Sequence, residues 1–508
     1  MMAFMAAKAE YDALPPDAPR DALHEKHAKT ALDFALAHRG VYIKAGQFIA
    51  SLQGGAGERA IPSAYVRTLQ KLTDDAPTVP LADVAAVFEA DVGSIASTFE
   101  LEFVDEQPVA AGSLAQVHRA RVDDVIGRRD VAVKIQFPGL DAQVAADLEA
   151  LRMMAAMMTT DVGWLLDDIT RHITTELDFR IEAQNANAAK HVLQYSWGLG
   201  HARGASPPVT IPAPIPHLCS SRVLCMEFLP GLVRLDDAAG LARVGVRGEE
   251  MGEWACRAFG MLSLVYGLVH GDPHAGNVYV SHQSTTPATY YETRNVRDRD
   301  YARLVILDHA LYHRLTDADR LAFCELILAC AQPFPSRTKV RHLAERFAGP
   351  LWPLFPLLLS PLFALATPLN VDELRDAAAA RLPARVSLDD VWQALDAMHS
   401  SDSDVIGLLH HLGYVRGLCS MTGLSERRRV KILVRCATIA VQEAWWPWAD
   451  RPMSVGTWQP LLHLRESLVL SAASMRVELL VLLLRVCALV LGLWAAVRRV
   501  VALVLLRK

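Results

Sequence analysis

The feature that most constrains this chain is a short polar loop, His270-Gly-Asp-Pro-His-Ala-Gly-Asn277, followed by an apolar run that ends in Asp308. Asp272 and Asn277 stand five positions apart in the loop. Phosphoryl transfer needs an aspartate beside the attacking hydroxyl, and oxygen ligands for the cations that neutralise the migrating group. The spacing therefore predicts Asp272 as the catalytic base, and Asn277 and Asp308 as ligands of Mg²⁺.

The sequence on both sides of this loop argues against an ordinary Asp-Pro turn. Apolar residues repeat at helical spacing from Met251 to Val269, which predicts one helix that ends just before the loop. Val278-Tyr-Val280 predicts a short strand, and residues 281–300 are a polar insertion before the next strand. Helix, loop, two strands and a final aspartate follow one another in the order found in kinases.

A kinase also needs a cation for the nucleotide phosphates and an acidic residue that holds this cation. Val131-Ala-Val-Lys134-Ile places one lysine in an alternating apolar strand, where a buried ammonium is costly unless it meets a negative charge. Glu182 is the expected partner, on a stretch from Glu176 to Asn185 that we predict to be helical. The alternatives are a surface lysine on an edge strand and a solvated acidic helix face.

Two further segments are candidates for contacts to the nucleotide. A loop between strand-like segments consists of small residues, which let backbone amides approach phosphate. These residues are Ala110, Ala111, Gly112 and Ser113. The strand that begins at Val223 ends in a turn suited to a hinge, whose backbone groups could bind adenine. The hinge candidates are Met226, Glu227 and Phe228.

Four segments together resemble the UbiB family of atypical protein-kinase-like proteins, also called aarF-domain-containing kinases. They are Lys44-Ala-Gly-Gln47, Ala110–Ser113, Glu176-Leu-Asp178 and His270–Asn277, and the resemblance covers residues 20 to 315. It implies a two-lobed kinase-like fold with extra helices. Together with the elements read from the sequence, the expected fold class is α+β, with an N-terminal helical extension, a helix-rich C-lobe and a hydrophobic C-terminal helix. The resemblance also implies that Lys44 and Gln47 form a lid over the active site, received by Glu176 and Asp178, which suits a small or lipid-like substrate.

The resemblance further implies an ATP-dependent phosphotransferase or ATPase that binds ATP or ADP with Mg²⁺. Its substrate would be a small molecule or lipid, linked to ubiquinone or to mitochondrial lipid homeostasis. A mitochondrial, membrane-associated location rests on the resemblance alone, because the N-terminus shows no clear transit peptide.

Two departures from the family pattern concern glycine. Asp308-His-Ala310 carries alanine where the family has glycine, which restricts positive backbone torsions, and its histidine resembles the eukaryotic mitochondrial subgroup. Gly112 interrupts the alanine-rich loop, which makes this loop more similar to the glycine-rich loop of common kinases.

The expected domains are an N-terminal extension over 1–85, an N-lobe over 86–229, a C-lobe over 230–450 and a tail over 451–508. In the tail, Leu479–Val497 is apolar except for Arg485 and long enough to cross a bilayer as a helix. We expect this helix to associate with a membrane; the alternatives are packing on its own domain and a poorly ordered tail. A net charge of -5 argues against a nucleic-acid partner.

Three other functions fit parts of the pattern. A small-molecule phosphotransferase of the aminoglycoside or choline kinase type shares the catalytic loop but does not need the helix that bears Lys44. A pseudokinase scaffold would bind nucleotide without turnover, and Ala310 leaves room for it. A metal hydrolase would use His270, Asp272 and His274 as ligands, but the sequence offers no fourth partner.

Overall fold

The computed structural model divides into two compact units, which together contain the whole chain. Unit 1 comprises Met1–Asp317 and Ala378–Leu424, and unit 2 comprises Ala318–Ala377 and Ser425–Lys508. All candidate catalytic, metal and nucleotide residues belong to unit 1. The structure describes residues 2–15, 20–38, 40–51, 62–73, 78–124, 127–156, 170, 173–198, 209–282, 302–332, 335–348, 352, 355–363 and 405–445.

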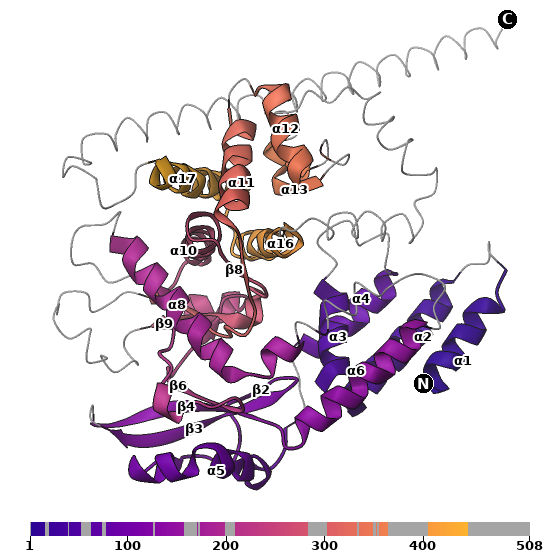
Figure 1. Cartoon of the computed structure of the whole chain (residues 1–508), viewed down its shortest axis with the longest axis vertical. Helices are drawn as coiled ribbons and strands as arrows, with labels where there is room; N and C mark the ends of the chain where they lie inside the picture. Colours follow the sequence, from indigo (N-terminus) through magenta and orange to yellow (C-terminus); the bar gives the residue numbers. More distant parts are fainter. Residues whose placement is uncertain are drawn as a thin grey trace, which may run out of the picture. The chain divides into compact units, whose positions relative to one another are not determined.

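Unit 1 begins with a group of helices, seen in indigo in Figure 1. They are α1 (Met2–Asp12), α2 (Asp21–His38), α3 (Gly40–Ser51), α4 (Ser63–Leu69) and the 3-10 turn η3 (Gln70–Thr73). An apolar core joins α2 and α3 to α4 and η3, with Leu32, Ile43 and Leu72 among its buried members. The core positions α3, which carries Lys44 and Gln47.

An antiparallel sheet follows, with strand order β1-β3-β4-β6 and with β2 paired to β3 (Figure 1). The strands are β1 (Glu102–Phe103), β2 (Ala110–Ala111), β3 (Ala115–Asp124), β4 (Gly127–Gln136) and β6 (Val223–Glu227). Helix α5 (Leu81–Thr98) packs on one face, where Val131, Val133 and Ile135 join its apolar core. Because side chains alternate along a strand, Lys134 lies on the opposite face.

Helix α8 (Phe179–Gly198) packs on the face that carries Lys134, through a cluster of Phe179, Ala183 and Leu224. Helix α6 (Leu140–Ala156) packs with α3. The predicted helix over 176–185 was wrong in its continuity, because the chain turns at Leu177–Asp178 and α8 begins at Phe179. Asp178 accepts the backbone N–H of Arg180 at 3.0 Å, as aspartate does at helix starts.

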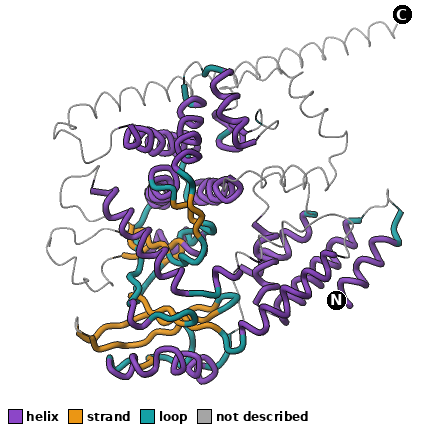
Figure 2. The backbone as a smooth tube through the Cα atoms, viewed as in Figure 1, coloured by secondary structure: helices purple, strands orange, loops and turns teal. Residues whose placement is uncertain are grey.

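The rest of unit 1 carries the predicted catalytic loop, residues 270–277, between short strands, which Figure 2 shows in orange. One sheet has the order β5-β10-β9-β7, and β8 pairs with β11. The strands are β5 (Val209–Thr210), β7 (Val233–Arg234), β8 (Leu268–His270), β9 (Val278–His282), β10 (Ala302–Ile306) and β11 (Tyr312–Arg314). The helical segments are η4 (Pro216–Leu218), α9 (Ala238–Arg243), α10 (Gly248–Gly260), the π-helix η5 (Met261–Val265), η6 (Ala275–Asn277) and α16 (Val405–Met421).

The helix predicted from 251 to 269 was wrong at its C-terminal end. After α10 and η5, Gly267 takes a φ of 69°, a left-handed conformation that ends the helix. Leu268–His270 is then held as a strand by pairing with Tyr312–Arg314. The strand predicted at Val278 is confirmed.

Unit 2 is helical among its described residues. It contains α11 (Asp317–Cys330), α12 (Arg337–Ala348), α13 (Phe355–Leu359), η8 (Pro361–Phe363) and α17 (Glu426–Trp445). Arg429 is 1% exposed and binds Glu426 and the carbonyl of Leu359. The apolar run Leu479–Val497 lies outside the described residues. Among the helices that are described, none has the length and hydropathy of a membrane span.

Candidate active site

The catalytic loop is fixed by hydrogen bonds that begin in β8 and end in η6. His270 accepts the backbone N–H of Asp272 through Nδ1 at 3.2 Å, and Asn277 donates from Nδ2 to the Asp272 carbonyl at 3.1 Å. The backbone N–H of Gly271 donates to the carbonyl of Leu311 at 2.8 Å. The loop therefore lies against the segment that directly follows Asp308.

Asp308 is held as an anion in an uncommon backbone conformation. Its φ is 59°, and its Oδ1 accepts the backbone N–H of Ala310 at 3.1 Å. Burial alone would raise the pKa of Asp308, but the ammonium groups of Lys134 and Lys44 hold that pKa well below its ordinary value. An ionised carboxylate is the kind of ligand that Mg²⁺ prefers, so the residue fits its predicted metal role.

Lys134 and Glu182 form the predicted ion pair. Lys134 Nζ lies 2.8 Å from one carboxylate oxygen of Glu182 and 3.0 Å from the other. Burial lowers the pKa of Lys134, but the carboxylates of Glu182 and Asp308 outweigh burial and raise it. The Phe179 ring, with its centroid 4.9 Å from Nζ, adds a cation–π contact. The ammonium thus stays charged and faces the carboxylate proposed to bind metal.

A second ion pair reaches the same place from the N-terminal helices. Lys44 Nζ lies 2.7 Å from Oε1 of Glu176, and both side chains are largely buried. Burial lowers the pKa of Lys44, but Glu176, Asp272 and Asp308 together raise it above its ordinary value. Helix α3 therefore brings a cation among the carboxylates of the candidate active site.

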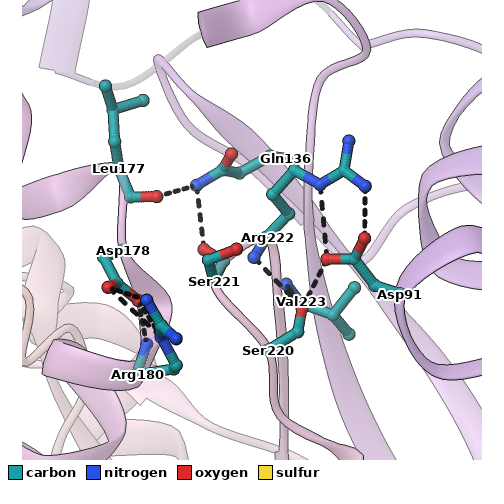
Figure 3. A network of polar contacts seen from close by, with 9 residues as sticks. All are labelled: Asp91, Gln136, Leu177, Asp178, Arg180, Ser220, Ser221, Arg222 and Val223. Carbon is teal, nitrogen blue, oxygen red and sulfur yellow. Dashed lines mark hydrogen bonds and ion pairs between the residues drawn. The ribbon is translucent and has the colours of Figure 1, made fainter.

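The other two residues expected to gate the site, Gln47 and Asp178, are not part of this ion pair. Gln47 lies on α3 one turn after Lys44, but its side chain is outside the described part of the chain. Asp178 is paired with Arg180 at 2.7 Å, as Figure 3 shows, and it starts α8. Of the four predicted gating residues, the structure thus brings Lys44 and Glu176 together.

The small-residue loop is the turn of a hairpin. Ala110 pairs with Val117 and Ala111 with Gln116, and the N–H of Gly112 donates to the carbonyl of Ala115 at 2.8 Å. Ser113 follows in the same turn. Since Val117 also lies opposite Lys134, the loop is close to the lysine strand. Its contact with phosphate stays a prediction.

The hinge candidates end the strand next to β4. Met226 lies opposite Ala132 and Glu227 opposite Val131, whereas Lys134 itself lies opposite Leu224, earlier on the same strand. The guanidinium of Arg119 lies 5.2 Å from the centroid of the Phe228 ring. All three hinge residues are partly exposed. Their contact with adenine stays a prediction.

Asn185 is a site residue that the sequence reasoning missed. Its Nδ2 donates to the carbonyl of His309 at 3.0 Å. The backbone N–H of His309 also interacts with the Glu182 carboxylate and lowers the pKa of Glu182, although burial of Glu182 has a larger, opposite effect. Helix α8 therefore contacts both peptide groups of the residue after Asp308. Asn185 follows Glu182 by three positions and so shares its helix face, which is the signal that would have identified it.

Gln136 is a second missed residue, shown in Figure 3. Its Nε2 donates to the carbonyl of Leu177 at 2.6 Å and contacts that of Ser221 at 3.3 Å. It follows Lys134 by two positions on the same face of β4, and Leu177 follows Glu176. Gln136 therefore connects the strand that carries Lys134 to the segment that carries Glu176. A polar residue at i+2 in an apolar strand was its signal.

His309, the residue after Asp308, is a neutral histidine with both ring nitrogens hydrogen-bonded. His309 Nε2 lies 3.2 Å from the carbonyl of Ile306 and must donate to it, so Nδ1 accepts the hydroxyl of Tyr312 at 3.0 Å. Burial lowers the pKa of His309 to about 4. The structure thereby assigns this histidine a neutral, hydrogen-bonded role beside Asp308.

The metal-hydrolase alternative receives no support from these histidines. His270 and His274 each use Nδ1 to accept a backbone N–H, from Asp272 and Gly276 respectively. Over the described ranges of the chain, no group of three or more His, Cys, Asp or Glu side chains is placed to hold a metal ion.

Comparisons with known proteins agree with this geometry. Residues 71–338 match the ABC1 atypical kinase-like domain. The chain is 31% identical over 362 residues to AarF domain-containing protein kinase 1 of Xenopus tropicalis, which covers 70% of this chain and 61% of that protein. It is 30% identical over 389 residues to the protein of that name in Gallus gallus, covering 74% and 67%.

A probable serine/threonine-protein kinase of Dictyostelium discoideum is 30% identical over 312 residues, covering 60% of this chain and 42% of that protein. The chain thus spans 61% of the length of the Xenopus tropicalis relative and less of the Dictyostelium one. The matched residues contain the sheet with Lys134, helix α8, the catalytic loop and Asp308. The chain belongs to the ABC1/AarF family of atypical kinases.

Proposed function

We propose that this chain binds Mg-nucleotide and transfers the terminal phosphoryl group of ATP to a small-molecule or lipid-like acceptor, or to water as an ATPase. The observation that carries the proposal is the convergence of opposite charges from distant parts of the chain. The ammonium group of Lys134, which lies 2.8 Å from Glu182, lowers the pKa of Asp308 against the effect of its burial. A triphosphate with its metal ion needs such a set of cations and anions.

Each residue has a separate task in this proposal. Lys134, held by Glu182, binds the nucleotide phosphates, and Asn277 and Asp308 provide oxygen ligands for Mg²⁺. When bound, magnesium supplies charge neutralisation for the phosphoryl group. Asp272 accepts the proton of the attacking hydroxyl. The Ala110–Ser113 loop covers the phosphates, and the hinge residues 226–228 bind adenine through their backbone.

The acceptor is proposed to be small because Lys44 and Glu176 are close to the reacting groups. Both Asp272 and Asp308 raise the pKa of Lys44, so α3 stands beside the region that an acceptor must enter. A location at the mitochondrial membrane, a link to ubiquinone and attachment through residues 479–497 are proposals that rest on family resemblance and on the apolar tail sequence. The kinase names of the relatives support phosphotransfer and leave the acceptor open.

A nucleotide-binding scaffold with little turnover is the second candidate. The observation that favours it is the Lys44–Glu176 pair, because the Lys44 cation competes with magnesium for the charge of Asp308.

A hydrolysis assay with and without lipid vesicles tests the proposal. We expect Asp272→Asn to lower kcat about a hundredfold or more while nucleotide still binds. Asp308→Asn should abolish the thermal stabilisation that Mg-ATP gives the wild type. Asp83→Asn, on the exposed face of α5, is the matched control and should behave as wild type. Equal hydrolysis by the wild type and Asp272→Asn would refute catalysis by this loop, and stabilisation without turnover would favour the scaffold.

A further inference from the structure

His274 lies two residues after Asp272 in the catalytic loop, and the proposed function gives it no task. Its Nδ1 accepts the backbone N–H of Gly276 at 2.9 Å. A ring nitrogen that accepts a hydrogen bond carries no proton, so the proton of the neutral imidazole is on Nε2. Nε2 lies 3.7 Å from Oδ2 of Asp272. The one N–H donor of this ring is therefore next to the carboxylate proposed as the catalytic base.

The absence of a side chain at Gly276 leaves room for the His274 ring. A Cβ built at residue 276 would lie 2.6 Å from Cε1 and 2.9 Å from Nδ1 of His274, so the ring occupies the space that a side chain would fill. The loop thus fixes the imidazole through a backbone donor and through the absence of a side chain. The side chains of His274 and Asp272 remain 29% and 31% exposed, so a substrate can reach both.

The separation of the two groups suits a transferred phosphoryl group. Nε2 of His274 and Oδ2 of Asp272 are only 3.7 Å apart. Two substrate oxygens, one about 2.8 Å from Nε2 and the other about 2.8 Å from Oδ2, can therefore be close neighbours. In phosphoryl transfer the attacking oxygen contacts the base, and the oxygens of the migrating group surround the atom it attacks. A donor beside the base is therefore placed to meet one of those oxygens.

We infer that His274 is a further catalytic residue, whose Nε2–H donates a hydrogen bond to an oxygen of the transferred phosphoryl group while Asp272 takes the proton of the attacking hydroxyl. The inference rests on the proposed function. The attacking oxygen forms a bond to phosphorus, and its proton passes to Asp272. The bond from phosphorus to the ADP oxygen breaks, and ADP leaves with the electron pair. His274 keeps its proton throughout and acts on the charge of the migrating oxygens.

Two substitutions separate this role from loop support. The amide nitrogen of His274→Gln lies near the position of Nε2, and the amide of His274→Asn lies near that of Nδ1. We expect His274→Asn to lower kcat at least tenfold and to leave the Kd for Mg-ADP within about twofold, because ADP lacks the transferred group. His274→Gln should retain most of the activity. Gly276→Ala, which displaces the ring, should resemble His274→Asn.

The opposite order would overturn the inference. If the ring serves only to accept the N–H of Gly276, His274→Asn keeps that bond and stays close to wild type, while His274→Gln loses activity and thermal stability.

A binding measurement keeps this test independent of turnover. Mg-ADP with aluminium fluoride, which mimics the transferred group, should bind the wild type more tightly than Mg-ADP alone, and His274→Asn should lose that difference in calorimetry. If the wild type and Asp272→Asn turn over ATP at the same rate, the proposed function is refuted, but this result does not decide whether His274 contacts the transferred group. Equal binding of the fluoride analogue by wild type and His274→Asn would sink the role of His274, whatever the turnover.

Discussion

Replacing Glu182 with glutamine tests the centre of the site without any ligand. The substitution keeps the shape of the side chain and removes its charge, which leaves the Lys134 ammonium without its closest partner. Glu182 is 3% exposed and binds Lys134 through both oxygens, at 2.8 and 3.0 Å. Breaking a buried ion pair from one side costs about 3–5 kcal/mol, because the remaining charge stays desolvated.

Two features of the site place the expected cost of Glu182→Gln at the lower end of that range. The Lys134 side chain is 20% exposed, so water can reach part of it. The carboxylate of Asp308 also continues to favour the charged form of Lys134. We therefore expect the free energy of unfolding to fall by about 3 kcal/mol. The double variant Glu182→Gln/Lys134→Met leaves no orphaned charge in the pair, so it should lose less than the sum of the two single variants by at least ~1 kcal/mol.

Urea unfolding without nucleotide measures these energies, and hydrogen exchange in α8 assigns the loss to unit 1. Gln184→Ala, at an exposed position of the same helix, is the control and should stay within about 0.5 kcal/mol of wild type. A Glu182→Gln protein as stable as this control would refute the reasoning, because it would mean that the pair is solvated. Additive effects in the double variant would refute it as well.

Three further perturbations address the rest of the site. Lys44→Met should tighten magnesium-dependent nucleotide binding about tenfold in calorimetry, because a cation no longer competes for Asp308; weaker binding would contradict this. Burial lowers the pKa of His411 from 6.5 to about 4, so the neutral form stabilises the fold above pH 6.5 and that stabilisation is lost as the pH falls towards 4. His411→Asn should lose about 3 kcal/mol less than wild type between pH 7 and 4 in urea unfolding, and an equal loss would exclude this histidine. Asn185→Leu should lower stability by about 1–3 kcal/mol and weaken magnesium-dependent binding, whereas Gln184→Leu should change neither.

The parts of the site that could be predicted from the sequence are those written in local patterns. The apolar run from Val131 to Ile135 contains Lys134 as its one charged residue, and the five-residue spacing of Asp272 and Asn277 is contained in one loop. The pairing of Lys134 with Glu182 also followed, since a buried ammonium needs a carboxylate and kinases hold this lysine with an acidic residue on a helix.

The features that could not be predicted depend on contacts between distant segments. Asn185 binds a carbonyl 124 residues further along the chain, and the sequence does not say which helix face meets that backbone. The helix before the catalytic loop ends at Gly267, and Leu268–His270 then forms a strand because it pairs with Tyr312–Arg314, a distant segment that no local pattern identifies. Helical periodicity continued through Val269 because the strand is buried as well.

The backbone conformation revises the expected effect of alanine at position 310. The sequence suggested that Ala310 would restrict a positive torsion, yet the left-handed conformation falls on Asp308, with a φ of 59°. Aspartate tolerates this region better than most residues, and its own carboxylate accepts the N–H of Ala310. Asn185 and Glu182 then hold the peptide groups of His309 on either side. The protein therefore preorganises the carboxylate that we propose to bind metal with its own hydrogen bonds, and this backbone conformation does not require glycine at position 310.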